Sequence, residues 1–143
     1  MSGPVDLAAA QRGLAAVAQT LLQDGRTAYA YPAAGVQRGD AVVMYPMDEP
    51  ISLAATFQRG GDELQLYLAV LCGLEQDPDT LDEIAAWIKG TDDVEAAVRS
   101  SHGFSGAVDD AWVTEARVST YTTLGQPADD LQLAVVFTVK IVS

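Results

Sequence analysis

The C-terminal stretch from Trp112 to Val142 constrains the fold most, because two long strand-like segments flank a run of turn-forming residues. Residues 112–123 and 131–142 are rich in β-branched and aromatic side chains, and residues 125–130 contain glycine, proline and aspartate. A strand of about 12 residues spans roughly 40 Å. A chain of this length folds to a diameter of about 37 Å. We therefore expect an antiparallel hairpin as long as the molecule, with its end or one edge outside the core.

The first half of the chain predicts one helix followed by strands. Apolar residues recur at helical spacing from Val5 to Asp24, and Gly25 is suited to cap that helix. A strand from Glu63 to Cys72 has two largely apolar faces, which is typical of a central strand. Shorter strands are expected at residues 26–31, 41–45 and 51–58, with a tight turn at 59–62.

Two helices are expected between this strand and the hairpin. Asp77 or Thr80 can cap the first, which ends at Gly90, and Thr91 can cap the second, from Asp92 to Ser100. The predicted buried stripe of the first helix consists of Leu81, Ile84, Ala85 and Ile88. Residues 100–106 are predicted to be a loop.

The expected fold class is α+β: a mixed or antiparallel sheet, with the N-terminal helix and the central helix pair packed on one face, and a long C-terminal β-hairpin. Residues 1–143 are expected to form one domain.

The reactive side chains are few. One histidine and one cysteine make neither a Cys/His zinc site nor an internal disulfide. Cys72 is expected to be a small buried hydrophobe. His102 lies in the serine- and glycine-containing loop, where it is either a loop residue or a general base for Ser101 or Ser105. Asp77 opens a segment that imitates a calcium loop, but leucine and aspartate occupy positions where that loop needs a ligand and a glycine. We expect no enzymatic activity, no metal and no cofactor.

The net charge is −12, with 20 acidic residues against 8 basic ones. Ten of the acids lie between Asp62 and Glu95, where Lys89 is the one base. Such a surface repels phosphate backbones, so specific nucleic-acid binding is not expected. It is interpreted either as a solvated face that maintains solubility or as a wall past which DNA slides. No apolar run has the roughly 20 residues that span a bilayer, so no membrane association is expected.

The order of elements resembles the tail terminator proteins of long-tailed bacteriophages. The resemblance rests on the N-terminal helix ending in Gly25, on residues 29–32 (Tyr-Ala-Tyr-Pro) and 41–46 (Ala-Val-Val-Met-Tyr-Pro), on the acidic helix pair, and on the closing hairpin to Ile141. It covers nearly the whole chain and includes no single diagnostic motif. Neck and head-completion proteins share this size and α+β character.

The resemblance implies a structural virion protein that forms a homo-oligomeric ring, hexameric in that family. The ring would sit on the last ring of the tail tube, stop tube polymerisation and offer its other face to the head–tail connector or stopper protein, while DNA passes through without specific binding. The protein would be assembled in the host cytoplasm and located in the tail or neck of the virion. The alternatives are a head-completion or connector neck protein, a small α+β ligand-binding or enzymatic domain, and a regulatory subunit of a cellular complex.

Two sets of residues follow as site candidates. Tyrosine and methionine tolerate a half-wet interface, and the end of the hairpin approaches neighbouring subunits. The candidates for the subunit or tube interface are Tyr45, Met47, Tyr121, Thr123 and Gln126. The candidates for an acidic lumen are Asp77, Asp79 and Asp82.

Overall fold

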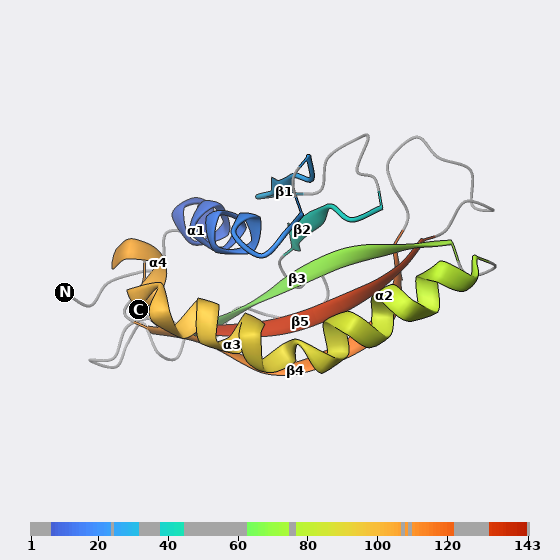
Figure 1. Ribbon diagram of the computed structural model, residues 1–143. Coiled ribbons are helices and arrows are strands. Elements are labelled where there is room, and N and C mark those ends of the chain that lie inside the picture. The colour runs from blue at the N-terminus through green and yellow to red at the C-terminus, as the bar shows by residue number, and fades with distance from the viewer. Residues whose placement is uncertain are drawn as a thin grey trace.

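A five-stranded mixed sheet forms the centre of the fold (Figure 1). The computed structural model describes residues 7–23, 25–31, 38–44, 63–74, 77–106, 108, 110–121 and 132–142. The strands lie in the order β1-β2-β3-β5-β4. Their bounds are Ala28–Tyr29 (β1), Ala41–Met44 (β2), Glu63–Leu74 (β3), Asp110–Tyr121 (β4) and Gln132–Val142 (β5). β1 runs parallel to β2, and the remaining pairs are antiparallel.

The helices cover one face of this sheet (Figure 1). α1 (Leu7–Gln19) lies against β1 and β2, whereas α2 (Pro78–Lys89) and α3 (Thr91–Ser100) extend across β3, β5 and β4. The core between the two layers is formed by the alternating apolar side chains of the strands and by one stripe of each helix. Within this core the rings of Phe137 and Trp87 meet in a T-shaped arrangement, with 6.2 Å between ring centroids.

The opposite face of the sheet carries a smaller buried cluster, which consists of Val42, Ala69, Leu71, Ala134 and Val136. Two cations lie over aromatic rings on this face. The Arg117 guanidinium is 5.4 Å from the centre of the Tyr67 ring, and the Lys140 ammonium is 5.9 Å from that of Trp112. On the face that carries no helix, the first contact reaches from β4 across β5 to β3, and the second joins β5 to β4.

The predicted α+β class, the central position of β3 and the hairpin of β4 and β5 are confirmed. β3 extends beyond Cys72 to Leu74, with a shift of register between Leu71 and Gly73. α1 ends at Gln19, so the predicted helical end at Asp24 is wrong; Gly25 has a φ of 84° but does not cap the helix. The predicted strand at 51–58 lies outside the described residues.

The segment predicted as a loop at residues 100–106 forms a short helix, α4 (His102–Gly106). His102 and Phe104 have φ values of 54° and 56°, in the left-handed region that costs about 1–2 kcal/mol for residues other than glycine. Phe104 is buried against Gly13 of α1, where an added Cβ would lie 2.4 Å from the Phe104 Cβ. Burial of this ring offsets the backbone cost, which local sequence patterns do not reveal.

Candidate functional site

The outer edge of β4 has no strand partner among the described residues. β4 pairs with β5 over its whole length and forms one end of the sheet. A shift of register between Val113 and Glu115 divides it. At the shift the Val113 N–H donates to the Glu95 carboxylate of α3 at 2.5 Å. The regular segment therefore runs from Glu115 to Tyr121, and we call it the open edge.

The other end of the sheet, at β1, is closed by two glutamine side chains of α1. The Gln19 amide donates to the Arg26 carbonyl at 2.8 Å and accepts from the Ala28 N–H at 2.9 Å. The Gln11 amide donates to the Ala30 carbonyl at 3.1 Å. These side chains satisfy backbone groups that a further strand would otherwise use. Among the described strands, one end of the sheet is therefore closed and the other is open.

The helix beside the open edge exposes apolar side chains, contrary to the sequence prediction. Leu81 is 66% exposed and Ile88 is 47% exposed, whereas Ile84 is 8% exposed and Thr80 is fully buried. The predicted buried stripe is thus wrong except at Ile84. The reason is rotation of the helix: the flank with Glu83 and Trp87 faces a cleft toward α1, so Leu81 and Ile88 lie on the opposite flank, toward β4.

Val118 continues this exposed apolar surface onto the open edge. Its side chain is 45% exposed, and its partner in β5 is Val135, which belongs to the core on the helix side. Val118 therefore projects on the same side of the sheet as α2. We call Leu81, Ile88 and Val118 the apolar flank. Sequence reasoning missed it because apolar residues occur on more than one side of α2, and periodicity alone does not say which side the sheet covers.

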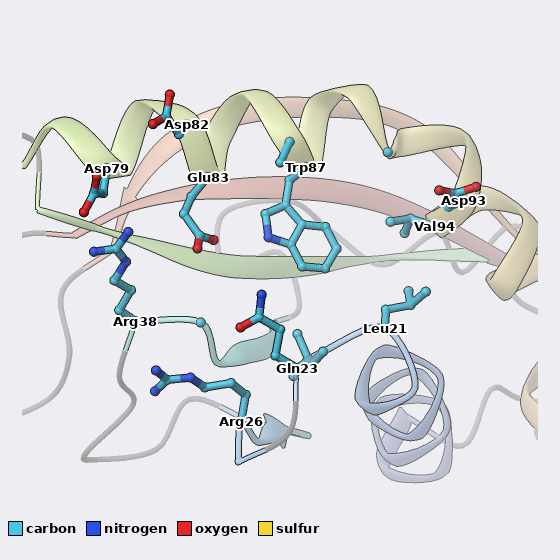
Figure 2. A pocket seen from close by; sticks show the side chains of 14 residues that line it. Leu21, Gln23, Arg26, Arg38, Asp79, Asp82, Glu83, Trp87, Asp93 and Val94 are labelled. Atoms are coloured by element: carbon cyan, nitrogen blue, oxygen red, sulfur yellow. The ribbon is translucent and has the colours of Figure 1, made fainter.

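A cleft of about 610 Å³ lies on the other flank of α2 (Figure 2). Glu83 and Trp87 extend into it from α2, facing Gln23 and Leu21 beyond the end of α1. Its charged lining consists of Arg26, Arg38, Asp79, Asp82, Glu83 and Asp93. Four carboxylates and two guanidinium groups thus surround an apolar floor, a composition that suits a ligand with both cationic and apolar parts.

The three acids predicted for a lumen have different surroundings in the structure. Asp77 caps α2, because its carboxylate accepts the Asp79 N–H at 3.0 Å, and it also pairs with Arg38. Asp79 and Asp82 line the cleft, with the Asp82 carboxylate turned away from Arg38 (Figure 2). The predicted cap at Thr91 is wrong, since its hydroxyl donates to the Ile88 carbonyl and the second helix has no side-chain cap.

The structure gives the two reactive side chains different environments. Cys72 is fully buried in the core, as predicted, and burial raises the pKa of its thiol from 9.0 to about 11. His102 is exposed on α4. The Ser101 hydroxyl donates to the Val98 carbonyl and accepts the Phe104 N–H, so it serves the turn rather than facing an imidazole. A raised thiol pKa opposes nucleophilic reactivity.

Of the predicted interface residues, Tyr121 is the last residue of β4 and ends the open edge. Tyr45, Met47, Thr123 and Gln126 lie outside the described residues. Within the described ranges no group of three or more metal-binding side chains comes together, and no helix there has the length and apolar character to cross a bilayer.

Comparisons with family models, curated proteins and solved structures gave no match to this chain.

Proposed function

We propose that this protein is a structural component of a bacteriophage virion that forms a ring on the end of the tail tube and terminates its polymerisation. The resemblance in element order suggests the family. The observation that supports the role is the asymmetry of the sheet, with one end open at β4 and the other closed by Gln11 and Gln19. An open edge attracts a further strand, whereas a closed edge does not pass the pairing on.

In this proposal the ring terminates the tube by binding to its last ring and covering the surface on which further tube subunits would add. One surface of the ring joins the tail tube protein, and the other, which does not propagate the tube, joins the connector or stopper protein. The open edge and the apolar flank supply the contact with a neighbouring copy or with the tube, and Tyr121 belongs to it. Asp79 and Asp82 remain candidates for an acidic wall of the DNA passage, whereas Asp77 is engaged with Arg38 and with the start of α2.

Negative-stain microscopy of the protein mixed with tubes of its tail tube protein tests the proposal. We expect rings with a central hole, ring-shaped density at one end of each tube, and tubes that no longer lengthen when more tube protein is added. Compact particles that leave tube growth unchanged would refute the proposed function.

The cleft favours a second candidate function, the binding of a small cationic ligand. Trp87 lies in the cleft and is one of two tryptophans, so a Trp112→Phe variant leaves it as the single tryptophan, which excitation selective for indole reports. Agmatine and spermidine are suitable probes because each is a multiply charged cation with an aliphatic chain. Saturable changes in Trp87 emission that Glu83→Gln abolishes would support a binding protein. Unchanged emission up to millimolar probe would exclude this class of ligand.

A further inference from the structure

We propose that in the free protein two copies pair through their open edges, residues 115–121 of β4, in an antiparallel arrangement about a two-fold axis at Val118. This goes beyond the proposed function, since it concerns the protein before it meets a tail tube. The pair would join two five-stranded sheets into one continuous sheet and would cover both open edges at once.

The choice of a second copy as the occupant follows from the two ends of the sheet. A neighbour that adds a strand to β4 must offer an unpaired edge of its own. The β1 end is not suited to this, because Gln11 and Gln19 already bond to the carbonyls of Arg26 and Ala30 and to the Ala28 N–H. Among the described strands, the edge that a second copy can offer is therefore its own β4. Pairing of like edges is isologous and closes after two copies.

The register follows from the irregularity in β4. The shift between Val113 and Glu115 ends regular pairing on one side, and the strand ends at Tyr121 on the other. Val118 is the middle residue of the segment between them. With the axis there, Val118 lies opposite Val118 of the partner subunit, and Ala116 lies opposite Thr120 of the partner subunit.

Charge permits this approach. The chain carries a net charge of −12, which opposes self-association in general. The open edge is locally neutral, because Glu115 and Arg117 are its only charged residues. In the proposed register Arg117 lies opposite Ser119 of the partner subunit, so no like charges face each other directly.

The apolar flank also fits a two-fold contact. Val118 and its symmetry mate would form an apolar pair on the helix side of the joined sheet, the side on which α2, with the exposed Leu81 and Ile88, packs near β4. Exposed apolar side chains on the same side of the sheet as an open strand edge support an interaction surface there more strongly than either feature alone.

Disulfide cross-linking tests the register in the full-length protein. Facing residues of an antiparallel pair have Cα atoms about 4.5–5.5 Å apart, which a disulfide bridges. Val118→Cys should therefore form a covalent dimer under mild oxidation, and an equimolar mixture of Ala116→Cys and Thr120→Cys proteins should form a mixed dimer. Ser119→Cys alone is the matched control and should stay monomeric on a non-reducing gel. Native Cys72 is buried and does not interfere.

Light scattering after size exclusion tests the pairing itself. The wild-type protein should be a dimer, and Val118→Lys, which places two ammonium groups opposite each other, should raise the dimer dissociation constant by about tenfold or more. Thr114→Lys, on the same strand at the irregularity, should leave the dimer intact; circular dichroism checks that both variants fold.

A monomeric wild-type protein, or cross-linking that does not depend on position, would overturn this inference. The dimer and the proposed function are tested independently. Tube capping by a protein that is monomeric when free would reject the dimer alone. Dimers without any effect on tubes would reject the function alone.

Discussion

Arg38 and Asp77 lie 39 residues apart in the sequence, yet the Arg38 guanidinium is 3.3 Å from the Asp77 carboxylate. The contact joins the segment before β2 to the start of α2, and Arg38 also lines the cleft. Both side chains are substantially exposed, at 36% and 40%, so the ion pair itself contributes little to stability. The other carboxylate oxygen of Asp77 caps α2, and we expect this hydrogen bond to account for most of the stability that Asp77 contributes.

Asp77→Ala should therefore lower the free energy of unfolding by about 1 kcal/mol, because it removes the cap. Asp77→Asn keeps a capping oxygen and should lose less than about 0.5 kcal/mol, the share of the exposed ion pair. Urea unfolding followed by circular dichroism measures both, with Asp82→Ala as a control on the same helix. Equal losses for the two variants would show that the ion pair, rather than the cap, stabilises this end of α2.

Ile84 and Leu81 of α2, which the sequence places in one buried stripe, should contribute very differently to the free energy of unfolding. Ile84→Ala empties a buried site and should cost about 2–4 kcal/mol of unfolding free energy. Leu81→Ala removes an exposed side chain and should stay within about 0.5 kcal/mol in the monomer. Measurements at several protein concentrations separate folding from association. A Leu81→Ala loss as large as that of Ile84→Ala at low concentration would mean that Leu81 is buried in the monomer.

Gly73 in β3 should not tolerate a side chain. Its φ is 123°, and an added Cβ would lie 2.7 Å from the Thr80 hydroxyl oxygen, which donates to the Leu74 carbonyl. We expect Gly73→Ala to destabilise the protein by about 2–3 kcal/mol, since backbone strain and a displaced buried hydroxyl act together. Gly25→Ala is the matched control: its φ is also positive, but nothing lies within 4 Å of its added Cβ. Similar losses of unfolding free energy in both variants would mean that backbone strain alone, without the contact to Thr80, causes the destabilisation.

The buried thiol of Cys72 should make stability fall at high pH. Burial raises its pKa from 9.0 to about 11, so the folded state binds the thiol proton more tightly than the unfolded state. The resulting stability is fully present below pH 9 and is lost progressively as the pH rises from 9 toward 11. The loss is limited to about 2.7 kcal/mol by the difference of about two in pKa. Urea unfolding should show a smaller decline over this range in Cys72→Ala, and an identical decline would contradict the assignment.

Removal of the glutamine side chains that bond to the β1 end should allow the protein to form oligomers larger than a dimer. The double variant Gln11→Ala and Gln19→Ala frees the Ala28 N–H and the carbonyls of Arg26 and Ala30. With both ends of the sheet open, we expect concentration-dependent oligomers larger than the dimer, detected by light scattering. Thr20→Ala, which removes a hydroxyl bonded only within α1's last turn, is the control. Unchanged particle size would mean that other groups protect β1.

The fold class followed from local patterns, because alternation and helical spacing are properties of short segments. The hairpin, the apolar β3 and the helix cap at Asp77 were all predictable in this way. The cleft and the closed edge were not, because they join segments distant in the sequence: Gln11 meets Ala30, and Arg38 meets Asp77. The rotation of α2 about its axis could not be predicted either. Its apolar residues allow two sides of the helix to face the sheet, and packing against the sheet determines which side does.

The two glutamines of α1 leave the described sheet with one edge for strand pairing, so for this kind of contact each molecule has a functionality of one in the sense of polymer chemistry. A unit with two reactive ends lengthens a chain, whereas a unit with one either couples with its own kind or becomes an end group. Where β4 joins a row of strands, α1 stands against the continuation of that row at β1, because the Arg26 and Ala30 carbonyls and the Ala28 N–H are already bonded to its glutamines.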